Sequence, residues 1–334
     1  MRALIKLTIL KLTMSFLLLT LTNFTVLAQQ DEQQPPEQVL AETKGDSKKT
    51  SENTSETKAE SKDTLKTKPK TIPVPPPRSL TLQYKDDLKH YLPANNVKPL
   101  LAGPDDYITL ITENSSVNNK GVVILLPDWQ QGATSPKAIN FLRKALPLQG
   151  WTTISIQPTS KPENYPSSAF KVSEQQQENK IIIDGYKLKL GAMMNAVIAK
   201  ANEYPGIVMI IAQGNHGAML VELLAQNNEQ ATISQVPNAF ILLSSYLLAS
   251  NNLIDETNTA FAKKLAYSEY PVLDLYLRHD NPIVLDKAKQ RLALSKQEMK
   301  IYYRQRQLNN DAMGYYPEQE LLTQINSWLK AIGW

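Results

Sequence analysis

The chain has no cysteine among its 334 residues and only three histidines, His90, His216 and His279. The absence of cysteine excludes disulfides, thiolate zinc sites, a cysteine nucleophile and a lipidated amino-terminal cysteine. The three histidines are far apart in the sequence and show no metal-binding spacing such as His-x-x-x-His. We therefore expect neither a metal nor another cofactor.

The sequence also lacks a marked excess of either charge. Lys and Arg number 36 and Asp and Glu 32, and three of the basic residues lie in the first eleven positions. Without residues 1–28, which contain no acid, 33 basic and 32 acidic residues remain. A nucleic-acid-binding protein typically carries a basic stripe or domain, so this balance does not favour one. A hydrophobic content of 42% is enough for a core but too low for a multi-span membrane protein.

Residues 1–28 have the pattern of a secretory signal peptide. Arg2, Lys6 and Lys11 precede an apolar run that ends in Val26-Leu27-Ala28. The uncharged part, 12–28, is shorter than the roughly 20 residues of a spanning helix, which favours cleavage over retention as an anchor. We therefore predict a periplasmic protein with no stable membrane span after cleavage.

Residues 29–77 have no Trp, Tyr or Phe, and mix nine acids and eight lysines with Gln, Ser, Thr and Pro. Such a segment buries too little apolar area to offset its ordering entropy, so we predict a disordered, Pro-rich linker. It is interpreted as a passive linker, with a partner-binding arm as the alternative. The folded domain is then expected at 78–334.

That domain alternates apolar runs with amphipathic stretches, which indicates an α/β fold. We predict strands at 107–112, 122–126, 151–156, 207–211, 239–243 and 272–276, with the first at an edge. We predict helices at 137–149, for about twenty residues up to Lys200, from 218, around 283–295 and at 318–332. This order indicates a doubly wound, mostly parallel sheet with helices on both faces and any site at the carboxyl ends of the strands.

The most informative segment is Ile211-Ala-Gln-Gly-Asn-His-Gly-Ala218, a sharp strand-to-helix turn. An α/β-hydrolase places its nucleophile at such a turn, in a Gly-x-Ser-x-Gly elbow. Aligning Gly217 with the last glycine puts Gln213 at the first glycine and Asn215 at the serine. Asn cannot serve as the nucleophile, but it tolerates a positive φ. The alternative is an ordinary tight turn of a doubly wound fold.

Two further segments fit the same architecture. Asp128 and Trp129 follow an early strand, where hydrolases place oxyanion-hole amides. Asp280 follows a late strand, where the triad acid lies, although it could instead cap the helix after Pro282. The triad histidine is expected after the segment Tyr302-Tyr303-Arg304-Gln305, but no histidine occurs between Leu308 and Pro317. Of the triad residues in the order Ser, Asp, His, the sequence thus has only the Asp at its expected place.

Several segments of the chain together resemble a known family, the domain-of-unknown-function 3530 family. The resemblance begins in Lys120–Asp128, Leu142-Arg143 and Gly150–Pro158. The resemblance continues in the segments Gln213-Gly214, Gly217-Ala218, Pro271–Tyr276, Arg291, Tyr303-Arg304-Gln305 and Trp328-Leu329. It implies a secreted or periplasmic bacterial protein with an α/β-hydrolase-like fold, and it supplies no established catalytic residues.

Three functional hypotheses follow. The first is a non-catalytic binding or envelope-associated protein, with its pocket near Asp128, Trp129, Gln213, Asn215 and His216. Its partner would be an unknown small molecule or an envelope protein. The second is an atypical hydrolase that uses Asp128 or Asp280 with His216 and an activated water, or a displaced nucleophile at Ser244 or Ser245. The third is a structural module whose linker recruits a partner. An enzyme should bring a histidine within about 3 Å of a carboxylate or hydroxyl in one cleft.

Overall fold

The computed structural model describes residues 77–225, 233 and 235–334. The expected signal peptide (1–28) and all but the last residue of the expected linker (29–77) lie outside these residues, so both stay predictions. Across the described residues, no helix is long and apolar enough to cross a membrane.

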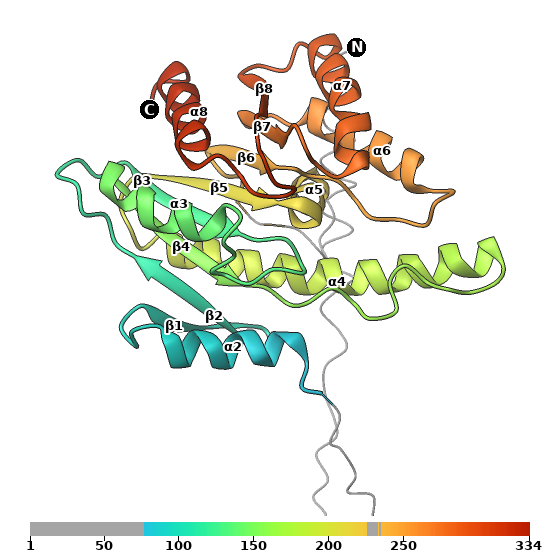
Figure 1. The fold of residues 1–334 in the computed structure, drawn as a ribbon, viewed down its shortest axis with the longest axis horizontal. Helices are drawn as coiled ribbons and strands as arrows, with labels where there is room; N and C mark the ends of the chain where they lie inside the picture. The colour runs from blue at the N-terminus through green and yellow to red at the C-terminus, as the bar shows by residue number, and fades with distance from the viewer. Residues whose placement is uncertain (1–76, 226–232, 234) are drawn as a thin grey trace, which may run out of the picture. The chain divides into compact units, whose positions relative to one another are not determined.

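Within residues 77–225 and 235–334, eight strands form one mostly parallel sheet (Figure 1). They are β1 (Val97–Ala102), β2 (Asp105–Thr112), β3 (Gly121–Leu126), β4 (Trp151–Gln157), β5 (Ile207–Gln213), β6 (Ala239–Leu243), β7 (Val272–Leu277) and β8 (Tyr303–Leu308). Their order in the sheet is β1-β2-β4-β3-β5-β6-β7-β8. Strands β3 to β8 pair in parallel, whereas β2 is antiparallel to both β1 and β4.

Helices cover both faces of this sheet. They are α2 (Leu80–Tyr91), α3 (Ile139–Ala145), the 3-10 turn η1 (Leu146–Gln149), α4 (Val172–Ala201), α5 (Gly214–Ala225), α6 (Ile254–Tyr267), α7 (Pro282–Gln297) and α8 (Glu318–Ala331). Val122, Ile124 and Leu126 of β3 pack against α4, α5 and α6. Val123 and Leu125 point to the other face, against α3 and α8. Alternate residues of a strand point to opposite faces, so a strand buried on both sides reads as one continuous apolar run.

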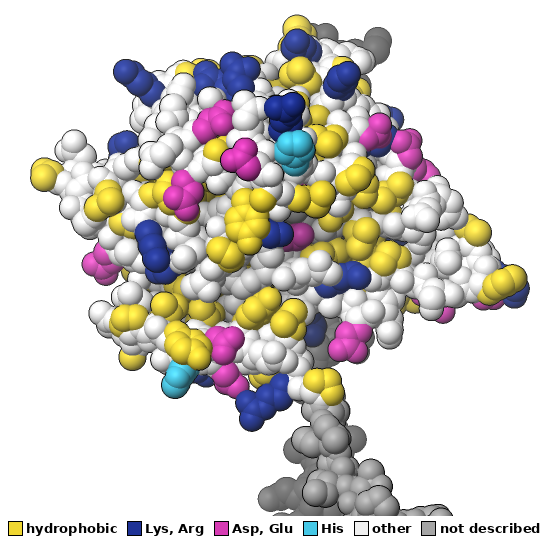
Figure 2. All heavy atoms as spheres, viewed as in Figure 1, with side chains coloured by type: hydrophobic (Ala, Val, Ile, Leu, Met, Phe, Trp, Pro, Cys, Tyr) yellow, Lys and Arg dark blue, Asp and Glu magenta, His cyan; other side chains and the backbone are white. Residues whose placement is uncertain are grey.

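The doubly wound, mostly parallel sheet predicted from the sequence is confirmed. The structure adds β1, α2 and α6, which the sequence did not predict, and it differs in two further details. Strand β2 is not at the edge, because β1 covers it. Helix α4 begins at Val172, well before the predicted helix, and its amino-terminal part extends beyond the strands (Figure 1). On the face drawn in Figure 2, hydrophobic side chains gather near the middle, with charged side chains around them.

A buried ion pair ties α7 to the last two strands. Arg291 Nε lies 2.7 Å from Asp274 Oδ2, and both side chains are almost fully buried. The same carboxylate oxygen accepts hydrogen bonds from the Tyr303 hydroxyl (2.9 Å) and from Gln305 Nε2 (2.8 Å). These four residues are among those that carry the family resemblance. In the structure these residues anchor α7 to the sheet. Helix α7 directly follows the segment that contains Asp280.

Candidate functional site

The strand-to-helix turn after β5 is as sharp as the sequence predicts, but the residue with the left-handed backbone is Gly214. Strand β5 runs to Gln213 and helix α5 begins at the next residue. Gly214 has φ +58°, whereas Asn215 is not among the residues with positive φ. The expectation that Asn215 takes the nucleophile's backbone conformation is therefore wrong by one residue. Only glycine adopts a left-handed conformation without steric cost, and the turn places that conformation at its glycine.

The Asp128 carboxyl group occupies the space above Gly214. A Cβ atom added to Gly214 would lie 2.4 Å from the carboxyl carbon of Asp128 and 2.5 Å from its Oδ2. A side chain at this position, serine included, would therefore collide with the carboxylate. The place where a hydrolase carries its nucleophile is filled by an acid from the loop after β3.

Two backbone amides converge on the same oxygen of Asp128. The N–H of Trp129 and the N–H of Asn215 each donate to Asp128 Oδ1 over 2.9 Å. In an α/β-hydrolase, the oxyanion hole consists of the N–H of the residue after the nucleophile and an N–H from the loop after the early strand. Asn215 follows Gly214, and Trp129 lies in the loop after β3. The two N–H groups thus come from the two segments that form an oxyanion hole in hydrolases, and here both bind a carboxylate of the chain itself.

The environment of this carboxylate opposes its ionisation. Burial of the carboxyl group raises the pKa of Asp128 to about 6, although the two N–H donors and the charge of Lys137 favour the ionised form. The residue as a whole keeps partial contact with solvent. At neutral pH most of the carboxylate is ionised, so a negative charge faces both amides.

The Asn215 side chain is engaged within the fold. Its Oδ1 accepts a hydrogen bond from Leu248 N over 2.8 Å, and its Nδ2 lies 3.5 Å from Asp128 Oδ1. Asn215 is fully buried. The carboxamide therefore links the β5 turn to the segment after β6 and fixes the first turn of α5. Gln213 is also buried, and its Oε1 has no hydrogen-bond partner among the described residues.

His216 lies in the core and not at the rim of a cleft. Its Nδ1 lies 2.5 Å from Pro127 O, and its Nε2 lies 2.7 Å from the Tyr186 hydroxyl, which also contacts Thr159 O over 2.8 Å. Burial lowers the pKa of His216 to about 4. The histidine does come within 3 Å of a hydroxyl, but both side chains are buried, so the pair has no access to a substrate.

Trp129 belongs to the same buried aromatic group. Its ring makes edge contacts with Tyr165 and Tyr186, at centroid distances of 5.8 and 5.9 Å. Trp129 is 3% exposed and Tyr165 7% exposed. The predicted binding residues Trp129 and His216 are thus close together, but they face the core behind the Asp128 loop.

Asp280 lies after β7, at the position of a triad acid, and binds no histidine. Its Oδ2 accepts hydrogen bonds from the Ser244 hydroxyl (2.5 Å) and from Leu277 N (2.8 Å). The Ser244 hydroxyl in turn lies 2.5 Å from the hydroxyl of Tyr316, in the segment after β8. The helix that follows is capped by Asn281 and not by Asp280, so the capping interpretation was wrong by one residue.

The sequence did not predict that Ser244 and Tyr316 would meet in one network with Asp280. Ser244 has φ +48°, an uncommon conformation for a residue other than glycine. Burial raises the pKa of Tyr316 well above its usual value, so its hydroxyl stays protonated. A tyrosine therefore occupies the region where a hydrolase carries its histidine. Nothing in its sequence position alone distinguishes it from the exposed Tyr315 beside it.

The site residues predicted from the sequence thus fall into two groups. Asp128, Trp129 and Asn215 meet at the turn after β5, with Gln213 and His216 buried beside them. Asp280 belongs to a separate network with Ser244 and Tyr316. Nowhere in the described part of the chain do three His, Cys, Asp or Glu side chains group so as to hold a metal ion.

A family model described as "Protein of unknown function (DUF3530)" matches residues 10–331. The chain belongs to the DUF3530 family. The resemblance noted in the sequence is therefore confirmed over nearly the whole chain. A search of curated proteins gave no match for this DUF3530 protein.

Solved esterase structures share the fold. Esterase 2 of Thermogutta terrifontis phosphonylated by sarin is 12% identical, with a TM-score of 0.52, covering 73% of this chain and 98% of the esterase. The same esterase phosphoramylated by tabun is 13% identical, with a TM-score of 0.51, covering 73% and 97% of the two chains. The α/β-hydrolase-like fold of this DUF3530 chain is thereby confirmed. Sequence identities this low show that the fold is shared and show nothing about function.

Proposed function

We propose that this DUF3530 chain is a periplasmic binding or envelope-associated protein that keeps the α/β-hydrolase fold without its catalysis. One observation carries the proposal: the Asp128 carboxylate accepts hydrogen bonds from both Trp129 N–H and Asn215 N–H, above the glycine that replaces the nucleophile.

The chemistry of acyl transfer supports this proposal. Hydrolysis of an ester needs free N–H donors where the carbonyl oxygen becomes negative. Here those donors already bind an anionic oxygen, and its charge opposes a second negative charge in the same place. Gly214 has no side chain to attack a carbonyl carbon, and no histidine of the described residues follows β8 to accept a proton.

The alternative is an atypical hydrolase with Ser244 as a displaced nucleophile or with an activated water. Two observations favour this possibility. The Ser244 hydroxyl donates a hydrogen bond to Asp280, and Ser244 has a positive φ, a strained conformation of the kind that clusters at active sites. Against it, Asp280 also accepts two backbone N–H groups, from Leu277 and Asn281, so both of its oxygens are already engaged within the fold. Tyr316 remains protonated and cannot replace the missing imidazole.

A fluorophosphonate serine probe and a panel of short-chain esters separate the two proposals. We expect no labelling and no turnover with the wild-type chain, and the same result for Ser244→Ala and Ser245→Ala. Stoichiometric labelling that disappears in Ser244→Ala would establish the displaced-nucleophile enzyme instead. The Thermogutta terrifontis esterase 2 provides the positive control, since it is phosphorylated by paraoxon and phosphonylated by sarin.

The periplasmic location rests on residues 1–28 and on the absence of cysteine. We expect the exported protein to begin at Gln29 and to fractionate with periplasmic proteins. Amino-terminal sequencing of the exported form tests this, and an intact Met1 in the membrane fraction would show an uncleaved anchor.

A further inference from the structure

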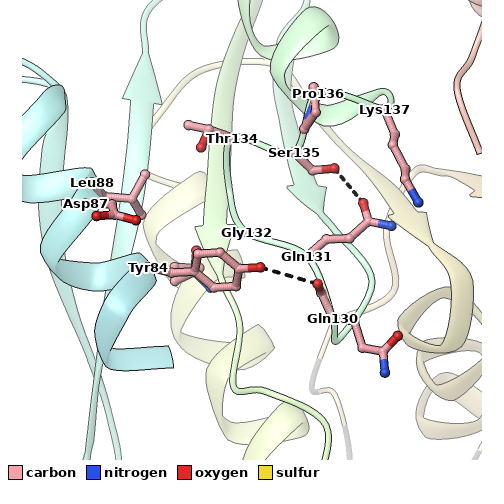
Figure 3. Close-up of a pocket in the computed structure, with 11 residues that line it drawn as sticks. Tyr84, Asp87, Leu88, Gln130, Gln131, Gly132, Thr134, Ser135, Pro136 and Lys137 are labelled. Atoms are coloured by element: carbon pink, nitrogen blue, oxygen red, sulfur yellow. Dashed lines mark hydrogen bonds between the residues drawn. The ribbon is translucent and has the colours of Figure 1, made fainter. Parts of the chain in front are cut away.

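A cavity of about 370 Å³ lies at the carboxyl end of β4, between α2 and the loop that follows Asp128 (Figure 3). It is separate from the Asp128–Gly214 contact and from the network of Asp280. Its volume falls within the roughly 300–1,000 Å³ of small-molecule sites, and the carboxyl ends of parallel strands are where α/β folds bind ligands. We propose that this cavity binds a saccharide of one or two rings.

The first feature that supports the proposal is an aromatic wall. Tyr84 of α2 crosses the cavity, with its hydroxyl 3.5 Å from Gln130 O (Figure 3). Gly132 lies beside the ring, where an added Cβ would make ordinary contact with Tyr84 at 3.5 Å but would press on Gln157 Oε1 at 3.1 Å. The faces of a sugar ring present C–H groups, which pack well on an aromatic side chain of this kind.

The second feature is a set of amides whose orientation is fixed by hydrogen bonds. Gln131 Oε1 accepts from the Ser135 hydroxyl over 2.6 Å, so its NH₂ group is left as a donor. Gln157 Oε1 accepts from Ala133 N over 3.0 Å, and the Ser155 hydroxyl donates to Ala133 O over 2.7 Å. The loop is thus braced from β4 before any ligand binds, which lowers the entropic cost of binding.

The third feature is the presence of donors and acceptors that the fold leaves unused. The Thr134 hydroxyl and the Asp87 carboxylate line the cavity, and neither makes a hydrogen bond or ion pair within the described part of the chain. The Lys137 ammonium also lines it, and its charge acts on Asp128 as well. In Figure 3, Asp87 lies on one side of the Tyr84 ring and Lys137 on the other. Amides, a hydroxyl, an acceptor and a donor around an aromatic face match a ligand with hydroxyl groups along its edge. A wholly apolar ligand would leave these groups unpaired.

The test is saturation-transfer NMR and calorimetry on the full-length chain with maltose, N,N′-diacetylchitobiose and digalacturonate. The three disaccharides are neutral, N-acetylated and acidic. Each is supplied at about 5 mM, because a small, shallow site is expected to bind in the millimolar range. We expect saturation transfer to the ring protons of at least one of them.

Two variants report on the site itself. Tyr84→Ala removes the aromatic wall and Thr134→Val removes a hydroxyl with little change of shape. Each should weaken binding by about tenfold. Tyr91→Ala, on the same helix and 76% exposed, should bind as the wild type does. Absence of saturation transfer from all three sugars, or binding that is unchanged in Tyr84→Ala and Thr134→Val, would overturn the proposal. The outcome does not depend on whether the turn after β5 is catalytic.

Discussion

The backbone N–H of Asn215 donates to Asp128 Oδ1 over 2.9 Å, across 87 positions of sequence. This contact joins the β5 turn to the loop after β3, the two segments that form an oxyanion hole in α/β-hydrolases. Trp129 N–H donates to the same oxygen, and under the proposed function this carboxylate takes the place of the negative oxygen that a hydrolase would stabilise there. Gly214 is consistent with this arrangement, because a side chain at that position would collide with the Asp128 carboxyl group.

Gly214→Ala is expected to lower the free energy of unfolding by about 2–4 kcal/mol, because it adds left-handed strain and a collision with the Asp128 carboxyl group. Gly185→Ala is the matched control. Gly185 lies inside α4, where an added Cβ meets nothing within 4 Å, so a gain of about 0.5–1 kcal/mol is expected. Denaturant unfolding measures both.

A second substitution separates strain from collision. In the Gly214→Ala background, Asp128→Gly should recover part of the lost stability, because it removes the carboxyl group and leaves only the backbone strain. If Gly214→Ala unfolds at the same denaturant concentration as the wild type, the close approach of Asp128 to Gly214 is not present in solution.

Arg291→Met should cost about 3–5 kcal/mol of stability, since it leaves the buried Asp274 carboxylate without its cation. Lys287→Met, on the same helix, is the control. The Lys287 side chain is 12% exposed, but its partners Asp255 and Asp286 are 78% and 71% exposed, so solvent screens both pairs and a loss of about 0–1 kcal/mol is expected. Chemical unfolding compares the two variants, and equal effects would show that the Asp274 network does not anchor α7.

The pH dependence of stability should reveal the buried state of His216. Its pKa is lowered to about 4 in the folded protein, so the unfolded chain binds the proton first as pH falls. The stability that depends on neutral His216 is complete above about pH 6.5 and is lost as pH falls towards 4, by up to roughly 3 kcal/mol. The difference in unfolding free energy between wild type and His216→Gln should follow this curve. A difference that does not vary between pH 7 and pH 4 would contradict the burial of the ring.

Limited proteolysis should remove the residues before about position 78 and leave a stable fragment. The Thr81 hydroxyl lies 2.6 Å from that of Ser160, so α2 is attached to the folded domain from its first turn. Upstream, the aromatic-free composition predicts ready cleavage. Mass spectrometry of the fragment identifies its first residue, and protection of 29–77 at the rate of the core would move the domain boundary.

Much of the fold could be predicted because buried parallel strands are continuous apolar runs. The predicted strand 239–243 has the bounds of β6, and β3 and β4 differ from their predictions by single residues at their ends. Helix α2 was missed because only Leu88 of its residues is buried, so its sequence shows little amphipathic contrast. Strand β1 was missed because Pro99 argues against a strand, although an edge strand tolerates it.

The site was predicted less completely, because its decisive features are long-range. The sequence indicated a strand-to-helix turn and an acid after β7, and both are present. It could not show which residue of the turn carries the positive φ, since Asn and Gly both tolerate that conformation. Nor could it show that Asp128 lies over Gly214, or that Ser244 and Tyr316 meet at Asp280, because no local pattern encodes such contacts.

The most direct test of the occupied oxyanion hole is the pH titration of the Trp129 and Asn215 amide resonances by NMR. If both N–H groups donate to Asp128, their proton shifts should change together with one midpoint at about pH 6, the pKa of that carboxyl group. In Asp128→Asn both changes should disappear. Separate midpoints for the two amides, or a titration that persists in Asp128→Asn, would contradict the account.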